Sequence, residues 1–98
     1  MSQLVETARQ QLRRAVLEAM EKAMEKGALP KAEPPKFTLE VPADRAHGDW
    51  ACNAAMAGAR AFHAAPRKIA EAITGDLDLA GTFFIKCEIA GPGFLNFT

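Results

Sequence analysis

The stretch Gly91-Pro92-Gly93-Phe94-Leu95-Asn96-Phe97-Thr98 decides the fold of this chain. Its Gly-Pro-Gly triplet predicts a turn, and the residues that follow alternate as in a strand. Leu95 and Phe97 therefore share one face, which we expect to be core, and Phe94 and Asn96 share the other, which we expect to be open. A ring beside an amide suits an unpaired nucleobase, which stacks on the ring while the amide bonds its edge. The alternative is that Phe94 packs beneath a neighbouring element, as large apolar side chains usually do.

Two earlier segments share this period of two. In residues 83–89 the alternation predicts a strand with Phe84, Lys86 and Glu88 on the open face. In residues 37–41 it predicts a strand that turns Val41, among others, toward the core. The three strands together predict a small antiparallel sheet.

Three helices are expected to cover one face of this sheet. Residues 2–27 carry apolar side chains at steps of three and four and end at Gly27, as an amphipathic helix does. An alanine-rich helix is expected from Trp50 to about His63, with Asp49 as its N-cap, and a shorter one begins at Pro66. The order α-β-α-α-β-β predicts an α+β fold, a two-layer sandwich with one face of the sheet open.

Composition limits the range of functions. The 98 residues are expected to form a single domain, residues 1–98, and 12 Lys and Arg balance 12 Asp and Glu. The chain as a whole therefore has no electrostatic drive toward nucleic acid, and alone it should bind RNA weakly. No apolar run is long enough to span a membrane. Cys52 and Cys87 lie in apolar contexts without ligand spacing, which favours reduced thiols in the cytoplasm.

His47 and Asp49 flank Gly48 in the loop before the second predicted helix. A histidine beside an aspartate can act as an acid–base pair. The structural interpretation is favoured, because Asp49 suits the start of a helix and no nucleophile or third metal ligand accompanies the pair. We therefore predict no catalytic residue and no metal site.

Three blocks occur in order along the chain: residues 47–53 (HGDWACN), 66–70 (PRKIA) and 90–97 (AGPGFLNF). Together with the long first helix, they resemble the N-terminal domain of arginyl-tRNA synthetase, and the resemblance covers essentially the whole chain. It implies an accessory domain that contacts the D-loop at the elbow of the tRNA for arginine and so supports arginyl-tRNA synthesis.

The resemblance assigns roles to particular residues. The aromatic ring and the amide that the family uses on a D-loop base correspond to Phe94 and Asn96. Lys86 and Phe84, on the neighbouring predicted strand, are candidate supporting contacts by geometry alone. The structural residues of the matching blocks are His47, Gly48, Asp49, Asn53, Gly91, Pro92 and Gly93.

The catalytic signatures of the family are absent from this sequence. We expect the ATP, Mg²⁺ and arginine sites to lie in the catalytic domain of the intact polypeptide, so that this domain alone does not aminoacylate tRNA and needs no cofactor. Two alternatives remain open. One is a free-standing RNA-binding module, and the other is a protein-interaction domain in which Phe84 and Phe94 form an apolar docking patch.

Overall fold

The described part of the chain forms four helices and four strands. The computed structural model describes residues 3–41, 50–80, 82, 84 and 86–98, and the statements below concern these residues. The helices are α1 (Gln3–Glu25), α2 (Ala54–Ala57), α3 (Ala59–Phe62) and α4 (Pro66–Asp76). The strands are β1 (Leu39–Glu40), β2 (Trp50–Cys52), β3 (Cys87–Ala90) and β4 (Phe94–Phe97).

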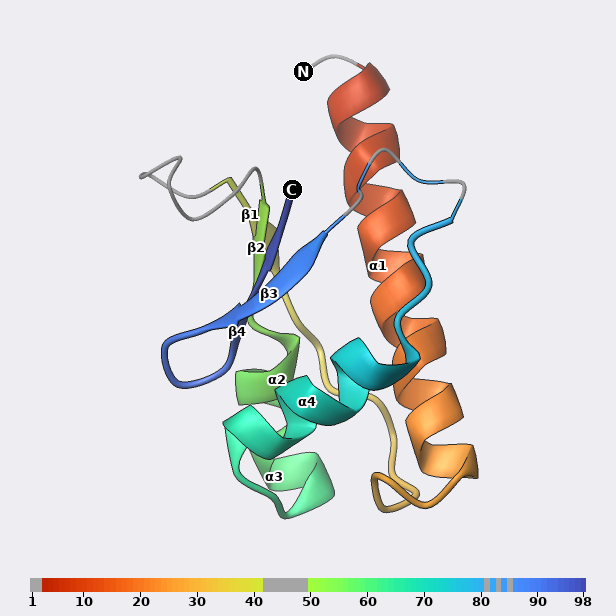
Figure 1. The fold of residues 1–98 in the computed structure, drawn as a ribbon, viewed down its shortest axis with the longest axis vertical. Coiled ribbons are helices and arrows are strands. Elements are labelled where there is room, and N and C mark those ends of the chain that lie inside the picture. The colour runs from red at the N-terminus through yellow and green to blue at the C-terminus, as the bar shows by residue number, and fades with distance from the viewer. Residues whose placement is uncertain (1–2, 42–49, 81, 83, 85) are drawn as a thin grey trace.

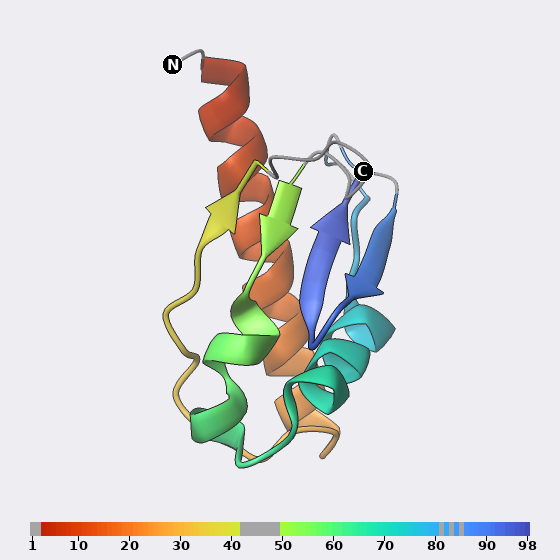
Figure 2. The same ribbon diagram turned by 90° about the vertical axis from the view of Figure 1, so that its left-hand side faces the viewer.

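The four strands form one antiparallel sheet in the order β1-β2-β4-β3. The C-terminal strand β4 is therefore central, between β2 and the hairpin strand β3. Figure 2 looks onto the sheet with α1 behind it, so the face toward the viewer is the one that α1 leaves uncovered. The helices α2, α3 and α4 gather at the end of the sheet where the β3–β4 hairpin turns (Figure 1).

Helix α1 supplies one wall of the core. Its buried side chains recur at helical spacing and include Leu12, Val16 and Met20, each fully buried. The helix ends in a Schellman motif, because the amides of Gly27 and Ala28 bond back to the carbonyls of Met24 and Ala23. Gly27 adopts a φ of 85°, the left-handed conformation that this ending requires.

The predicted α+β class is confirmed, but the prediction that a helix opens at Trp50 is wrong. Trp50–Cys52 is strand β2, paired with β1 on one side and β4 on the other. The helix begins only at Ala54 and is divided at Gly58 into α2 and α3. Pairing with two strands outweighs the helical preference of an alanine-rich segment.

Two predicted orientations also need correction. Phe84 was expected on the open face, yet it is buried, and its ring meets that of Phe97 edge-on with centroids 6.2 Å apart. The Thr82 hydroxyl accepts a hydrogen bond from the Phe84 amide and donates one to the Leu79 carbonyl, so a turn precedes β3. Val41 was expected in the core but lies past the end of β1 and is exposed.

Within the described residues, none of the helices has the length and apolar character needed to cross a lipid bilayer.

Candidate nucleic-acid interface

Strand β4 presents two different faces. Leu95 and Phe97 are fully buried, whereas Phe94 on the opposite face is 38% exposed and Asn96 is half-buried. The predicted separation of these two pairs of side chains is confirmed. Phe94 and Asn96, two residues apart on the uncovered face of a central strand, are called the platform below.

The neighbours of the platform are small on two sides. Ala90 of β3 lies opposite Phe94, and Ala51 of β2 lies opposite Asn96. Alanine side chains are too short to cover a ring or an amide across a strand pair. These two alanines therefore leave the Phe94 ring and the Asn96 amide partly accessible to solvent.

The hairpin turn that leads into the platform is fastened to helix α4. Gly93 has a φ of 148°, and a Cβ placed there would lie 3.0 Å from the Cβ of Pro66 and 3.1 Å from its carbonyl carbon. On the other side of the turn, the Arg67 guanidinium donates a hydrogen bond of 2.9 Å to the Gly91 carbonyl. The start of α4 thus fixes the loop immediately before Phe94.

Lys86 lies on the uncovered face but does not offer a free charge. Its ammonium nitrogen is 2.6 Å from a carboxylate oxygen of Glu88, and both side chains are exposed. Glu88 in turn lies directly opposite Asn96 in the β3–β4 ladder. The Asn96 amide of the platform therefore lies next to an ion pair that carries no net charge.

The thiols of Cys52 and Cys87 are held in the protonated form, which is the less reactive form of cysteine. Burial raises the pKa of Cys52 to about 11 and, together with the neighbouring Cys52 and Glu88, raises the pKa of Cys87 to about 12. In the part of the chain that the structure describes, no three His, Cys, Asp or Glu side chains are grouped as ligands for a metal ion.

Comparison with known proteins places these features in a family. The model of the arginyl tRNA synthetase N terminal domain matches residues 10–98. The chain belongs to this family. It is 48% identical over 97 residues to an arginine–tRNA ligase of Desulforamulus reducens and 38% identical over 97 residues to one of Acetivibrio thermocellus. Each alignment covers 99% of this chain and 17% of the relative, so the chain spans about a sixth of the length of these ligases.

Two of the blocks that resemble the arginyl-tRNA synthetase N-terminal domain meet in space. The block at residues 66–70 opens α4, and the block at residues 90–97 forms the hairpin turn and β4, where Pro66 and Arg67 contact the turn. Arg67 had not been singled out from the sequence. Its place in a shared block was the available signal, but its contact with a carbonyl 24 residues away is a tertiary feature.

The third block is described only in part. Asn53 follows β2, and its side-chain oxygen accepts a hydrogen bond of 2.8 Å from the amide of Thr38, the residue before β1. This bond ties the start of β1 to the start of α2. Asn53 thus occupies the N-cap position of α2, but its side chain bonds to Thr38 and not to an amide of the helix. His47, Gly48 and Asp49 lie outside the described residues.

The burial of Phe84 changes the list of candidate contacts. A ring that packs on Phe97 inside the core cannot stack on a base or join Phe94 in an exposed docking patch. The apolar patch that favoured a protein-interaction domain therefore loses one of its two members. Lys86 stays on the open face, immediately before β3, where its backbone pairs with that of Thr98.

Proposed function

We propose that this chain is the tRNA-recognition domain of an arginine–tRNA ligase, and that its platform binds an unpaired base in the D-loop at the tRNA elbow. Phe94 stacks on the base and Asn96 hydrogen-bonds its edge. The observation that carries the proposal is that Phe94 is exposed and Asn96 half-buried on one face of a central strand, while Leu95 and Phe97 on the opposite face are fully buried.

The chemistry of the platform supports this ligand over others. An aromatic ring binds any base through stacking, and an amide provides both a donor and an acceptor for the base edge. Such contacts read bases that are splayed out of a helix, as in loops, and they carry little information in a duplex. Lys86 has a lesser part in this proposal, because Glu88 already balances its charge.

The supporting residues keep the platform in one place. The turn before Phe94 is held by Pro66 and Arg67, and β4 is paired along both edges. A platform that is ordered before the ligand arrives loses less entropy on binding. The ATP, Mg²⁺ and arginine sites of the ligase belong in this proposal to its catalytic domain.

The test is aminoacylation kinetics of the ligase that carries this domain. Stacking of a base on an aromatic ring contributes roughly 1–3 kcal/mol, so Phe94→Ala should lower kcat/KM for tRNA by about tenfold or more. Asn96→Ala should lower it less and should weaken the preference for one D-loop base. The KM values for arginine and ATP should not change. A folded Phe94→Ala enzyme with unaltered kinetics toward tRNA would refute the proposal.

A further inference from the structure

The Asn96 amide cannot by itself tell one base from another. A side-chain amide offers both a donor and an acceptor, and a turn about its last torsion exchanges the two, so it can match the edge of any base. A preference for particular bases needs a second group of fixed polarity beside the amide. The sheet places two residues directly opposite Asn96, which are Ala51 of β2 and Glu88 of β3.

Of these two neighbours, Glu88 has the chemistry of a base-reading group. Ala51 has no polar side-chain atom. Glu88 shares the uncovered face with Asn96 because the two are direct partners in an antiparallel pair, which brings their Cβ atoms within about 4.5–5.5 Å. The Glu88 side chain is 61% exposed, so its carboxylate is open to a base that reaches the Asn96 amide.

The carboxylate of Glu88 keeps a free oxygen despite its ion pair. One oxygen lies 2.6 Å from the Lys86 ammonium nitrogen. The other oxygen has no partner among the residues that the structure describes. A carboxylate only accepts hydrogen bonds, whereas an amide can also donate them. The free oxygen of Glu88 therefore suits a donor on the base and disfavours a carbonyl oxygen.

We infer that Glu88 accepts a hydrogen bond from an amino group on the edge of the base that Phe94 stacks on, and that it thereby selects bases which carry such a group. The inference rests on the proposed function and names the class of base that the platform binds. Adenine, cytosine and guanine each carry an exocyclic amino group. Uracil carries none, and the carbonyl oxygens on both sides of its ring N–H are repelled by the carboxylate. Asn96 bonds the ring atom next to the amino group.

The sign of the effect separates this role from that of a bystander. RNA is a polyanion, so removal of an uninvolved carboxylate should strengthen the use of every tRNA. Glu88→Gln keeps the length and shape of the side chain but removes its charge and adds a donor. If Glu88 reads the base, this variant should lower kcat/KM by about tenfold for a tRNA with an amino-bearing base, as loss of a hydrogen bond to a charged acceptor does, but not for a tRNA with uracil.

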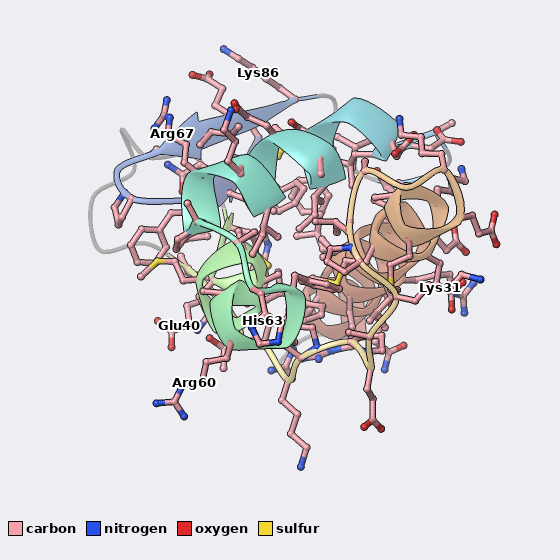
Figure 3. The ribbon with its side chains drawn as sticks, turned by 90° about the horizontal axis from the view of Figure 1, so that it is seen from below. Lys31, Glu40, Arg60, His63, Arg67 and Lys86 are labelled. Atoms are coloured by element: carbon pink, nitrogen blue, oxygen red, sulfur yellow. The ribbon has the colours of Figure 1, made fainter. Side chains whose placement is uncertain are left out.

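Glu40→Gln is the matched control. Glu40 lies opposite Ala51 on the same face of the sheet, but on the edge strand β1, so its backbone is two strands, or about 10 Å, away from Asn96. Figure 3 shows Glu40 and Lys86 well apart, toward the two edges of the sheet. The variant therefore removes the same charge without removing a contact to the base. Lys86→Gln is a second control, because it breaks the ion pair and leaves the carboxylate.

The experiment measures aminoacylation by the ligase that carries this domain, with transcripts of the tRNA for arginine in which each unpaired D-loop base is changed in turn to the other three. At the position that affects the wild type, the base with the highest kcat/KM should carry an amino group, and uracil should give a value about tenfold lower. Glu88→Gln should reduce this ratio to near one. Glu40→Gln and Lys86→Gln should keep the ratio, and all three variants should melt near the wild type, because a surface ion pair contributes little to stability.

The inference is overturned if Glu88→Gln keeps the wild-type ratio or raises kcat/KM for all four bases alike, if Glu40→Gln lowers the ratio equally, or if uracil is the preferred base. A defect of Phe94→Ala beside an unchanged ratio in Glu88→Gln would reject the role of Glu88 and leave the stacked base standing. Unaltered kinetics of a folded Phe94→Ala enzyme would refute the proposed function itself, and this inference with it.

Discussion

Replacing Gly93 by alanine should separate the hairpin from helix α4. Gly93 has a φ of 148°, a conformation that residues with a Cβ rarely adopt. The added Cβ would lie 3.0 Å from the Pro66 Cβ and 3.1 Å from the carbonyl carbon and oxygen of Pro66. Two of these three atoms are backbone, so they cannot rotate away as the end of a long side chain can. Either α4 must move away from the turn, or the turn must change its conformation.

The expected cost follows from these two effects. An unfavourable backbone conformation costs about 1–3 kcal/mol. Overpacking against a neighbour that cannot yield costs about 1–3 kcal/mol more. The free energy of unfolding should therefore fall by at least about 2 kcal/mol. For a domain of this size, each 1 kcal/mol lowers Tm by roughly 4–8 °C, so Tm should fall by at least about 8 °C.

Two other glycines provide controls in the same chain. At Gly75, within α4, an added Cβ would have no atom within 4 Å, so Gly75→Ala should raise stability by about 0.5–1 kcal/mol. At Gly91, with a φ of 57°, the nearest atom is 3.9 Å away, so Gly91→Ala should cost only the left-handed conformation, about 1–2 kcal/mol.

Urea and thermal denaturation of the three variants, followed by circular dichroism, should rank their stabilities as Gly75→Ala, then Gly91→Ala, then Gly93→Ala. A Gly93→Ala protein within about 0.5 kcal/mol of the wild type would show that the close approach to Pro66 is not a constraint on the fold. A Gly93→Ala protein more stable than Gly91→Ala would contradict the argument equally.

Three further predictions concern other parts of the molecule. Phe84→Ala should destabilise the chain by about 3–5 kcal/mol in urea denaturation, as truncation of a buried ring does, whereas Phe94→Ala should change its stability by less than about 1 kcal/mol; equal losses would contradict their opposite placements. Asn53→Ala leaves the Thr38 amide, just before β1, without its acceptor and should cost about 1 kcal/mol by the same assay, with no change expected in tRNA contact once the variant is folded. The pKa values of Cys52 and Cys87 are raised from 9.0 to about 11 and about 12, so the unfolded chain loses these protons at a lower pH than the folded chain. The free energy of unfolding should therefore fall as pH rises above about 9, by up to roughly 1.4 kcal/mol per pH unit for each thiol. If a double Cys→Ala variant shows the same fall, the pH dependence belongs to other groups.

The parts of the fold that could be predicted are those in which local pattern and tertiary structure agree. Strand β4 alternates over its whole length, and α1 keeps its apolar stripe over 23 residues, so both were predictable. Pro66 at the first position of α4 was a further local signal. Because Phe94 and Asn96 lie two residues apart on one strand, their shared face was predictable too.

The parts that could not be predicted depend on contacts between distant segments. Strand β2 has three residues, too few to show a period of two, and its alanine-rich continuation favours helix. Its place in the sheet is fixed by pairing with β4, more than forty residues away. The inward turn of Phe84 depends on hydrogen bonds of the Thr82 hydroxyl, which interrupt the alternation that runs through Lys86 and Glu88.

The contacts by which α4 supports the platform could not be predicted from the sequence either. Neither the contact of Pro66 with Gly93 nor that of Arg67 with Gly91 follows from spacing, since each joins residues more than twenty positions apart. A resemblance can show that two blocks occur together, but only the folded chain shows that one block holds the other in place.

The central claim, that the platform on β4 binds an unpaired base, is tested most directly by nuclear magnetic resonance. The isotope-labelled 98-residue chain is titrated with the tRNA for arginine and, separately, with the same tRNA carrying abasic sites in place of its unpaired D-loop bases. We predict that the largest shifts with the intact tRNA fall on the backbone amides of Phe94–Phe97 and on the Asn96 side-chain amide, and that these shifts disappear with the abasic tRNA. Shifts that spare β4, or that persist unchanged with the abasic tRNA, would contradict the claim.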